Sequence, residues 1–400
     1  MLRKVHQLYS AAREGRIASG LLWRGQALTD KAQNRLENEK HKRSNPYYRH
    51  FYASDPMKDR RAKLDDAVQS AIIRRITQAY LRAKSVQPQQ APPYQIGRQW
   101  QGIYETNYRP LIDALRKQDE DELKALFANC FRSTITRGLE MGTDYLKYRD
   151  RGFDSWYANA YLGNFNTWVQ LFRGVRSLNE LSFPLIGNPF GPVIEGHFIP
   201  RCSIRQSYHA ARLAGLMRSV DTPVVCEIGA GFGGMGYHLL KHHSRKAHYI
   251  DFDLPETLAI ATYFLLNAFP DKQVLLFGEG DLSSKRLATF DIVLMPNFIL
   301  QNLEDGSVDA VFNSDSLVEM ELETIQEYVM QIGRVCRDVF LHFNHDGTDF
   351  RKSFLYSGTP AKPFGLISAA RLEGTNLRRI SMTPALFESR HHYECVYRCA

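Results

Sequence analysis

Glu227 stands near the end of a β-branched run, and four small residues follow it: Gly229, Ala230, Gly231 and Gly233. Glycine lets the backbone turn sharply and lets a ligand approach without interference from a Cβ atom. A turn of this kind between a strand and a helix is where α/β proteins hold a cofactor. No Gly-Lys-Ser/Thr sequence follows it, so the turn is not a phosphate-binding P-loop. A dinucleotide and S-adenosylmethionine remain as candidate ligands.

Two features of this turn separate the two ligands. The carboxylate of Glu227 would repel an incoming pyrophosphate and attract the ammonium group of a methionine moiety. The glycines follow the pattern G-x-G-x-G-G, whereas the dinucleotide fingerprint is G-x-G-x-x-G. Both features favour S-adenosylmethionine over a nicotinamide dinucleotide.

An acid lies at the end of the next strand-like run, HYIDFD. Ribose hydroxyls need a hydrogen-bond acceptor at this position, whichever of the two cofactors is bound. Asp253 is the expected acceptor, and Asp251, two residues earlier on the same face, is the second choice. The alternative is that the two acids are an exposed pair at a strand end.

Three further side chains are candidates for catalysis. Asp315 and Glu319 follow the strand-like run VDAVFNS, and His345 follows DVFLHFN. Ligands of open parallel sheets bind beyond the carboxyl ends of the strands. Histidine accepts protons near neutral pH, so His345 is the expected general base, while Glu319 either shares that role or orients a substrate hydroxyl. The alternatives are helix capping for the two acids and no role for His345.

No pattern of residues is typical of a dedicated metal site, and no metal is expected. Asp315 together with Asp346 is the one pair considered as a divalent-ion alternative. The adjacent histidines His391 and His392 are interpreted as surface residues without a chemical role. The six cysteines form neither a zinc motif nor a disulfide framework, which favours a reducing, cytoplasmic location.

The elements that must position these residues alternate between strand and helix from residue 221 to 400. Such alternation predicts an α/β fold with a mostly parallel, Rossmann-like sheet and helices on both faces. No helical pattern separates the last two strand-like runs, so the final strand is expected to be antiparallel. Residues 221–400 are therefore the predicted cofactor-binding domain.

The rest of the chain is predicted to form two further regions. Residues 1–150 are expected to be helical, and residues 151–220 are expected to be an aromatic, glycine-rich connector with a helix. Within them, apolar spacing predicts helices over 64–85, 120–142 and 205–220, a loop over 45–56, a Pro/Gln linker over 85–97, and a loop or short hairpin over 185–200.

Several stretches resemble class I S-adenosylmethionine-dependent methyltransferases, and more closely the bacterial putative sugar O-methyltransferase family. They are GNPFG, SIRQSYHAARL, CEIGAGFGG, IDFDLPETL, FDIVLMPNF and VDAVFNSDSLVEM, all between about 180 and 345. The resemblance implies the fold, S-adenosylmethionine as cofactor and a sugar or glycan hydroxyl as acceptor. It also implies that Glu227 and the glycines hold the methionine end and that Asp253 holds the ribose.

The adenine side of the cofactor should meet the loop after the third strand of the sheet. Two runs compete for that place: KQVLLFG, which leads to Gly280 and Asp281, and DIVLMPNF, which contains Pro296 and Asn297. The second is favoured because it is the run that resembles the family.

The charge of the chain is uneven. The net charge is +8, and residues 1–150 hold 28 Lys and Arg against 17 Asp and Glu. The basic region either presents solvated helix faces or faces an anionic partner such as a membrane surface or an acidic polysaccharide. Peripheral membrane binding and self-association are the functional roles considered for it. No nucleic-acid-binding motif is present, so no nucleic acid is expected. An NAD-dependent oxidoreductase and a non-catalytic methyltransferase-like scaffold are the alternative functions.

Overall fold

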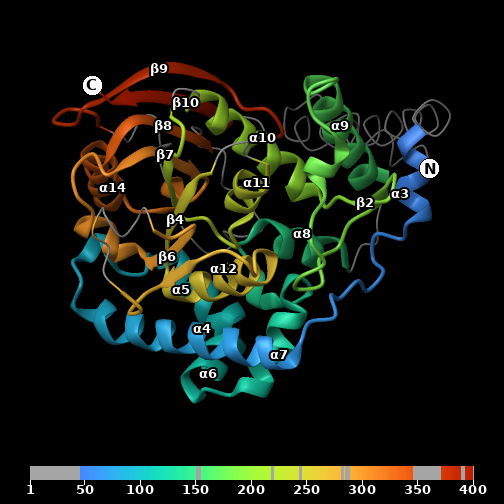
Figure 1. Cartoon of the computed structure of the whole chain (residues 1–400), viewed down its shortest axis with the longest axis horizontal. Helices are drawn as coiled ribbons and strands as arrows, with labels where there is room; N and C mark the ends of the chain where they lie inside the picture. Colours follow the sequence, from blue (N-terminus) through green and yellow to red (C-terminus); the bar gives the residue numbers. More distant parts are fainter. Residues whose placement is uncertain are drawn as a thin grey trace, which may run out of the picture.

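A computed structural model describes residues 46–149, 155–217, 220–242, 246–280, 283, 289–345, 371–388 and 392–399 of the chain. A twisted sheet lies at the centre, with helices on both of its faces (Figure 1). The α/β fold with a mostly parallel sheet is therefore confirmed.

The main sheet has eight strands among the described residues, in the order β5-β6-β4-β3-β7-β8-β10-β9. Neighbouring strands from β5 to β8 pair in parallel, and β10 is antiparallel to both β8 and β9. The predicted antiparallel final strand is thus confirmed. The strands are β3 (Val224–Ile228), β4 (His248–Asp253), β5 (Val274–Leu276), β6 (Ile292–Pro296), β7 (Val308–Ser314), β8 (Cys336–His345), β9 (Leu377–Pro384) and β10 (His392–Cys399).

Two apolar cores lie on the two faces of this sheet. Alternate residues of a strand enter different cores, as Val225 and Cys226 of β3 do, because successive side chains of a strand point to opposite faces. The central strands are buried on both faces and are mostly apolar, with β6 apolar throughout. Four helices flank them: α10 (Arg201–Leu216), α11 (Gly234–His242), α12 (Pro255–Ala268) and α14 (Leu322–Val335).

The order in which the chain adds parallel strands to the sheet reverses between β3 and β7. From β3 it proceeds through β4 to β6 on one side, and it then crosses to β7 and β8 on the other. Open sheets hold their ligands at such a switch point, beyond the carboxyl ends of the strands. The run DIVLMP forms β6 beside β4, while VLL forms the outer strand β5. The strand containing Pro296 is therefore the one that adjoins β4, as favoured from the sequence.

The described part of the first 150 residues is helical and packs on the sheet domain. Its long helix α4 contacts α12 and the edge strand β5 (Figure 1). Asp65 caps α4 by accepting a hydrogen bond from the backbone N–H of Val68 at 2.9 Å. The described α-helices that precede α10 are α3 (Pro46–Ala53), α4 (Asp66–Val86), α5 (Arg98–Ile103), α6 (Arg109–Lys117), α7 (Glu120–Ala128), α8 (Glu140–Arg149) and α9 (Ser155–Leu171). A hairpin of β1 (Val193–Ile194) and β2 (His197–Phe198) follows α9.

Three sequence predictions in this region were wrong. The stretch 45–56 contains helix α3, because Phe51 packs into the core. The helix expected over 120–142 ends at Ala128, and short 3₁₀ turns replace it where Ile135 is buried and Thr136 Oγ1 donates to the carbonyl of Cys130. The Pro/Gln stretch 85–97 is no free linker, since the hydroxyl of Tyr94 donates to Glu327 of α14 at 2.9 Å.

Strand β9 forms one edge of the sheet. It pairs with β10 on one side, and most of its residues are exposed, Ile380 and Met382 among them. Over the described residues, no helix combines the length and apolar character that crossing a membrane requires.

The contact between the helical region and the sheet domain generates a stability prediction. Phe127 of α7 is fully buried and stacks on Tyr263 of α12 with ring centroids 4.8 Å apart. We expect Phe127→Ala to lower the free energy of unfolding by about 3–5 kcal/mol, the usual cost of removing a buried phenyl ring. Urea titration followed by tryptophan fluorescence and by circular dichroism measures this loss. If the two regions were independent, the two signals would separate and only one would shift.

Candidate active site

A cavity of about 740 Å³ opens at the carboxyl ends of the parallel strands. Its lining brings together most of the residues predicted from the sequence: Glu227, Gly229, Ala230, Gly231, Asp253, Asn297, Asp315, Glu319 and His345. Three predicted residues, Gly233, Asp251 and Pro296, do not line it.

The pairing of the strands explains why these residues meet. Ile228 of β3 lies opposite Phe252 of β4 on one side and Asn313 of β7 on the other. The chain therefore leaves all three strands at the same edge of the sheet. The glycine turn, Asp253 and Asp315 follow directly and surround the same space.

The glycine turn depends on backbone conformations that favour glycine. Gly229 has φ of 70°, and a Cβ atom there would lie 2.2 Å from the hydroxyl oxygen of Ser316. Gly231 has φ of 65°, and its N–H donates to Asp253 Oδ2 at 3.0 Å. At Gly233, by contrast, a Cβ atom would meet Leu265 of α12 at 2.9 Å, so this glycine serves helix packing and not the cavity wall.

Three carboxyl groups gather at the ends of β3 and β4. Glu227 is buried and accepts a hydrogen bond from the hydroxyl of Tyr249 at 2.5 Å. Burial, with the nearby charge of Asp253, raises the pKa of Glu227 to about 8. Burial also raises the pKa of Asp253 to about 7, although two backbone N–H groups oppose the shift. Asp251 is fully buried behind them, and burial and its two acidic neighbours hold its pKa well above the usual range.

No salt bridge joins these three acids to a lysine or arginine among the residues that the structure describes. Buried carboxylates normally have a cationic partner or a metal, because ionising them alone in a nonpolar interior is costly. The arrangement therefore fits a ligand that brings positive charge to the glycine turn.

Asn297, which follows β6, lies on another wall of the cavity. Its amide nitrogen donates to the carbonyl of Tyr94 at 3.2 Å and contacts the hydroxyl of Tyr328 at 3.1 Å. Its Oδ1 is buried and has no hydrogen-bond partner among the described residues. Asn297 can therefore accept a hydrogen bond from a ligand.

Asp315 is held by hydrogen bonds from two basic side chains. Its backbone has φ of 63° as the chain turns away from β7. Arg205 Nη1 donates to its Oδ2 at 3.0 Å, and His392 Nε2 lies 3.0 Å from its Oδ1. Burial alone would raise the pKa of Asp315, but His392 and Arg205 hold it well below its usual range. The capping role considered for Asp315 is absent, since no side-chain bond caps the 3₁₀ turn Leu317–Glu319 that follows.

The other two catalytic candidates lie at different places in the cavity. Glu319 Oε2 accepts a hydrogen bond from the indole N–H of Trp100 at 2.8 Å. His345 is buried at the end of β8, and its ring packs edge-on against that of His392 with centroids 5.5 Å apart. Asp346, the alternative metal ligand, lies outside the described residues.

The interpretation of His392 as a surface residue was wrong. It is 8% exposed and lines the cavity, because β10 pairs antiparallel with β8 and places it opposite His345. Burial alone would lower the pKa of His392, but its hydrogen bond to Asp315 and the charge of that residue raise it.

Sequence reasoning missed other polar residues of the cavity, chiefly on α10 and in the helical region. Arg201, Arg205 and His209 all line the cavity at intervals of four residues. That spacing places them on one helix face and was a readable signal. Trp100 and Glu140 carried no such signal, because they reach the cavity through the docking of distant helices.

No protein-family model and no curated protein matches the chain. Solved structures with a similar fold include an O-methyltransferase family 2 protein from Planctomyces limnophilus (14% identity, 48% of this chain, TM-score 0.33), of which the chain spans only 58%. A SAM-dependent methyltransferase from Aquifex aeolicus shares 14% identity over 48% of this chain and 89% of that one, with a TM-score of 0.32. Magnesium protoporphyrin IX methyltransferase from Synechocystis PCC 6803, with bound SAH, shares 11% identity over 60% and 97% of the two chains, with a TM-score of 0.33. At such identities and scores, these likenesses carry no argument about ligand or activity.

The raised pKa of Glu227 generates a pH prediction for the ligand-free protein. A group with a folded pKa of about 8 against an ordinary 4.5 stabilises the fold fully below 4.5, and this stabilisation is lost as the pH rises to about 8. We expect the unfolding free energy of the wild type, relative to Glu227→Gln, to fall over this range by at most about 1.4 kcal/mol per pH unit. Chemical denaturation at several pH values measures it, with the exposed Glu321→Gln as the control. Parallel curves for wild type and Glu227→Gln would contradict the prediction.

Proposed function

We propose that this chain is an S-adenosylmethionine-dependent O-methyltransferase that acts on a hydroxyl of a sugar or glycan. The observation that carries the proposal is the group of three buried carboxyls, Glu227, Asp251 and Asp253, gathered without a cationic side chain at a glycine turn. The resemblance of the surrounding sequence to sugar O-methyltransferases supports the choice of acceptor.

The charge of the site supports this cofactor over a dinucleotide. S-adenosylmethionine carries an ammonium group and a cationic sulfur, both of which an acidic pocket attracts. A nicotinamide dinucleotide would bring an anionic pyrophosphate to the same turn, next to Glu227. Binding of a cation favours the ionised form of Glu227, so we expect protons to be released when the cofactor binds.

The walls of the cavity offer matching groups for the nucleoside. Asp253 is fixed by hydrogen bonds from the backbone N–H groups of Gly231 and Leu254 and would accept hydrogen bonds from the ribose hydroxyls. Asn297 Oδ1, buried and without a partner among the described residues, would accept one from the exocyclic amine of adenine.

The bound cofactor supplies a methyl group on sulfur, and the acceptor oxygen takes it in a single displacement. The chain must hold the acceptor hydroxyl in line with the methyl carbon, which supplies much of the rate. It must also accept the hydroxyl proton, since the product is a neutral methyl ether. His345 and Glu319 are the proposed groups for this step, and Trp100 fixes the carboxylate of Glu319.

The polar end of the cavity suits an acceptor with several hydroxyls. Arg201, Arg205, Glu140, Asp144 and Glu388 all line it. Such a density of donors and acceptors hydrogen-bonds a polyhydroxylated ring, whereas a flat aromatic acceptor needs apolar walls.

The cofactor assignment is tested by binding. We expect Gly231→Val to abolish binding of S-adenosylmethionine, because φ of 65° strains a β-branched residue and the added Cβ atom meets Leu139 at 3.3 Å in the lining of the cavity. Asp253→Asn keeps the shape of the side chain and should weaken binding by about 10- to 100-fold, the worth of hydrogen bonds to a charged group. Isothermal titration with S-adenosylmethionine and with NAD measures both, with the exposed Asp121→Asn on α7 as the control. Binding of NAD by the wild type, or normal S-adenosylmethionine affinity in both variants, would refute the assignment.

The proton acceptor is tested by turnover with radiolabelled S-adenosylmethionine and a panel of mono- and oligosaccharides. We expect His345→Ala to lower the methyl-transfer rate by about 100-fold or more, the usual contribution of a general base, without a change in cofactor affinity. Glu319→Gln should have a smaller effect, since the amide oxygen still accepts the bond from Trp100. A crippled Glu319→Gln beside a nearly normal His345→Ala would reverse the two roles. Absence of turnover on every acceptor, with cofactor binding intact, would favour a non-catalytic scaffold.

A further inference from the structure

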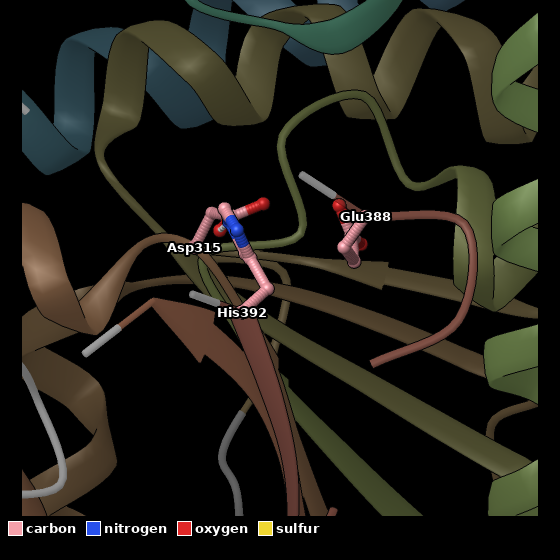
Figure 2. A group of neighbouring side chains, drawn as sticks. All are labelled: Asp315, Glu388 and His392. Carbon is pink, nitrogen blue, oxygen red and sulfur yellow. Dashed lines mark hydrogen bonds and ion pairs between the residues drawn. The ribbon is translucent and has the colours of Figure 1, made fainter. Parts of the chain in front are cut away.

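Asp315, Glu388 and His392 meet at the polar end of the cavity. One ligand-type atom from each lies within 4.8 Å of the others. Figure 2 shows Asp315 and His392 side by side, with Glu388 facing them from a separate segment of the chain. The atoms come from the end of β7, the turn before β10 and the first residue of β10. Ligands bound to one metal ion at about 2.1 Å lie at most about 4.2 Å apart, so only a small closure separates this cluster from a coordination sphere.

More carboxyl groups than guanidinium groups meet at the cluster. Three carboxylates, those of Glu140, Asp315 and Glu388, converge on the single guanidinium of Arg205. Glu388 and His392 are mostly buried, so solvent screens these charges poorly. An additional cation at the three ligand atoms would offset the excess.

An independent observation points to a ligand at the same place. His209 is 1% exposed, and its Nε2 has no hydrogen-bond partner among the described residues. This atom lies 3.6 Å from Glu388 Oε1, too far for a hydrogen bond. The His209 ring is fixed by stacking on the ring of Phe343, with ring centroids 3.9 Å apart. A buried nitrogen aimed at the cluster without a partner fits a site whose ligand, or water bound to that ligand, supplies the missing contact.

Arg205 hydrogen-bonds two of the three side chains of the cluster, as an outer-shell partner of a metal site does. It donates to Asp315 Oδ2 and to Glu388 and leaves Asp315 Oδ1 facing His392 Nε2. Carboxylates that bind metals are themselves held by hydrogen bonds of this kind, which fix their orientation.

We propose that Asp315, Glu388 and His392 bind one divalent metal ion at the polar end of the cavity. An imidazole with two carboxylates suits Mn²⁺ or Zn²⁺ better than Mg²⁺ or Ca²⁺, which prefer oxygen ligands alone. The proposed metal site is argued from its own residues, whereas its role in methyl transfer rests on the proposed function. A bound ion would coordinate the acceptor hydroxyl and lower the pKa of that hydroxyl, which makes the oxygen a better nucleophile.

The test is titration of the full-length, chelator-treated protein with Mn²⁺, followed by electron paramagnetic resonance, with Zn²⁺ and Mg²⁺ as competitors. We expect one equivalent of Mn²⁺ to bind, Zn²⁺ to displace it and Mg²⁺ to displace it poorly. Asp315→Asn, Glu388→Gln and His392→Ala should each weaken binding by about 10-fold or more, because even outer-shell substitutions cost about 10- to 100-fold. Glu321→Gln, an exposed acid on the same cavity, should bind Mn²⁺ like the wild type.

Titration of the same variants with S-adenosylmethionine shows that they are folded and separates the two proposals. Absence of saturable Mn²⁺ and Zn²⁺ binding by the wild type overturns the metal site, whether or not the cofactor binds. Equal Mn²⁺ affinity in the wild type and all three folded ligand variants overturns it as well. Metal binding without S-adenosylmethionine binding supports the site and refutes the proposed function alone.

Discussion

The guanidinium of Arg205 joins parts of the chain that are far apart in sequence. It donates to Glu140 of α8, to Asp315 after β7 and to Glu388 before β10. The helical region, α10, the parallel strands and the C-terminal pair of strands thus meet at one largely buried charge. Removing one partner of such a buried group typically costs about 3–5 kcal/mol, because the remaining charges are left uncompensated. The walls of the cavity therefore depend on this interaction for their relative positions.

The two ends of the cavity differ in whether their acids have cationic partners. Around Arg205 the acids have cationic partners, and the pKa of Asp315 is held low. At the glycine turn Glu227 and Asp253 have none among the described residues, and burial raises the pKa of both. The salt bridges of Arg205 hold one wall of the cavity in place, whereas the carboxyl groups at the glycine turn have no cationic side chain beside them among the described residues. A single cavity thus combines an end whose acids are paired with Arg205 and an end whose acids remain available to a cationic ligand.

Sequence patterns predicted the sheet, and they predicted that the residues of the glycine turn lie together, because both depend on local signals. Alternating strands and helices define the parallel order, and Glu227, Gly231 and Asp253 follow directly on two strands. The polar end of the cavity depends on long-range pairing instead. His392 enters the cavity because of its register with His345 across two antiparallel strands, which residue types do not reveal. Trp100 and Glu140 arrive by docking of helices whose apolar faces indicate burial but not the partner. The prediction of one helix over 120–142 was wrong for a related reason, since tertiary burial of Ile135 outweighs helical periodicity.

The exposed edge strand β9 bears on how the protein behaves at high concentration. No strand of the described part of the chain pairs with the outer side of β9, and such an edge offers backbone N–H and carbonyl groups to another chain; Ile380 and Met382 add apolar surface to it. The neighbouring exposed arginines Arg378 and Arg379 oppose self-association, because two such edges brought together would set like charges against each other. Pro384 ends the strand without a donor. This edge is thus protected from intermolecular sheet growth by charge and by proline, and neutralising its arginines would shift the chain towards aggregation.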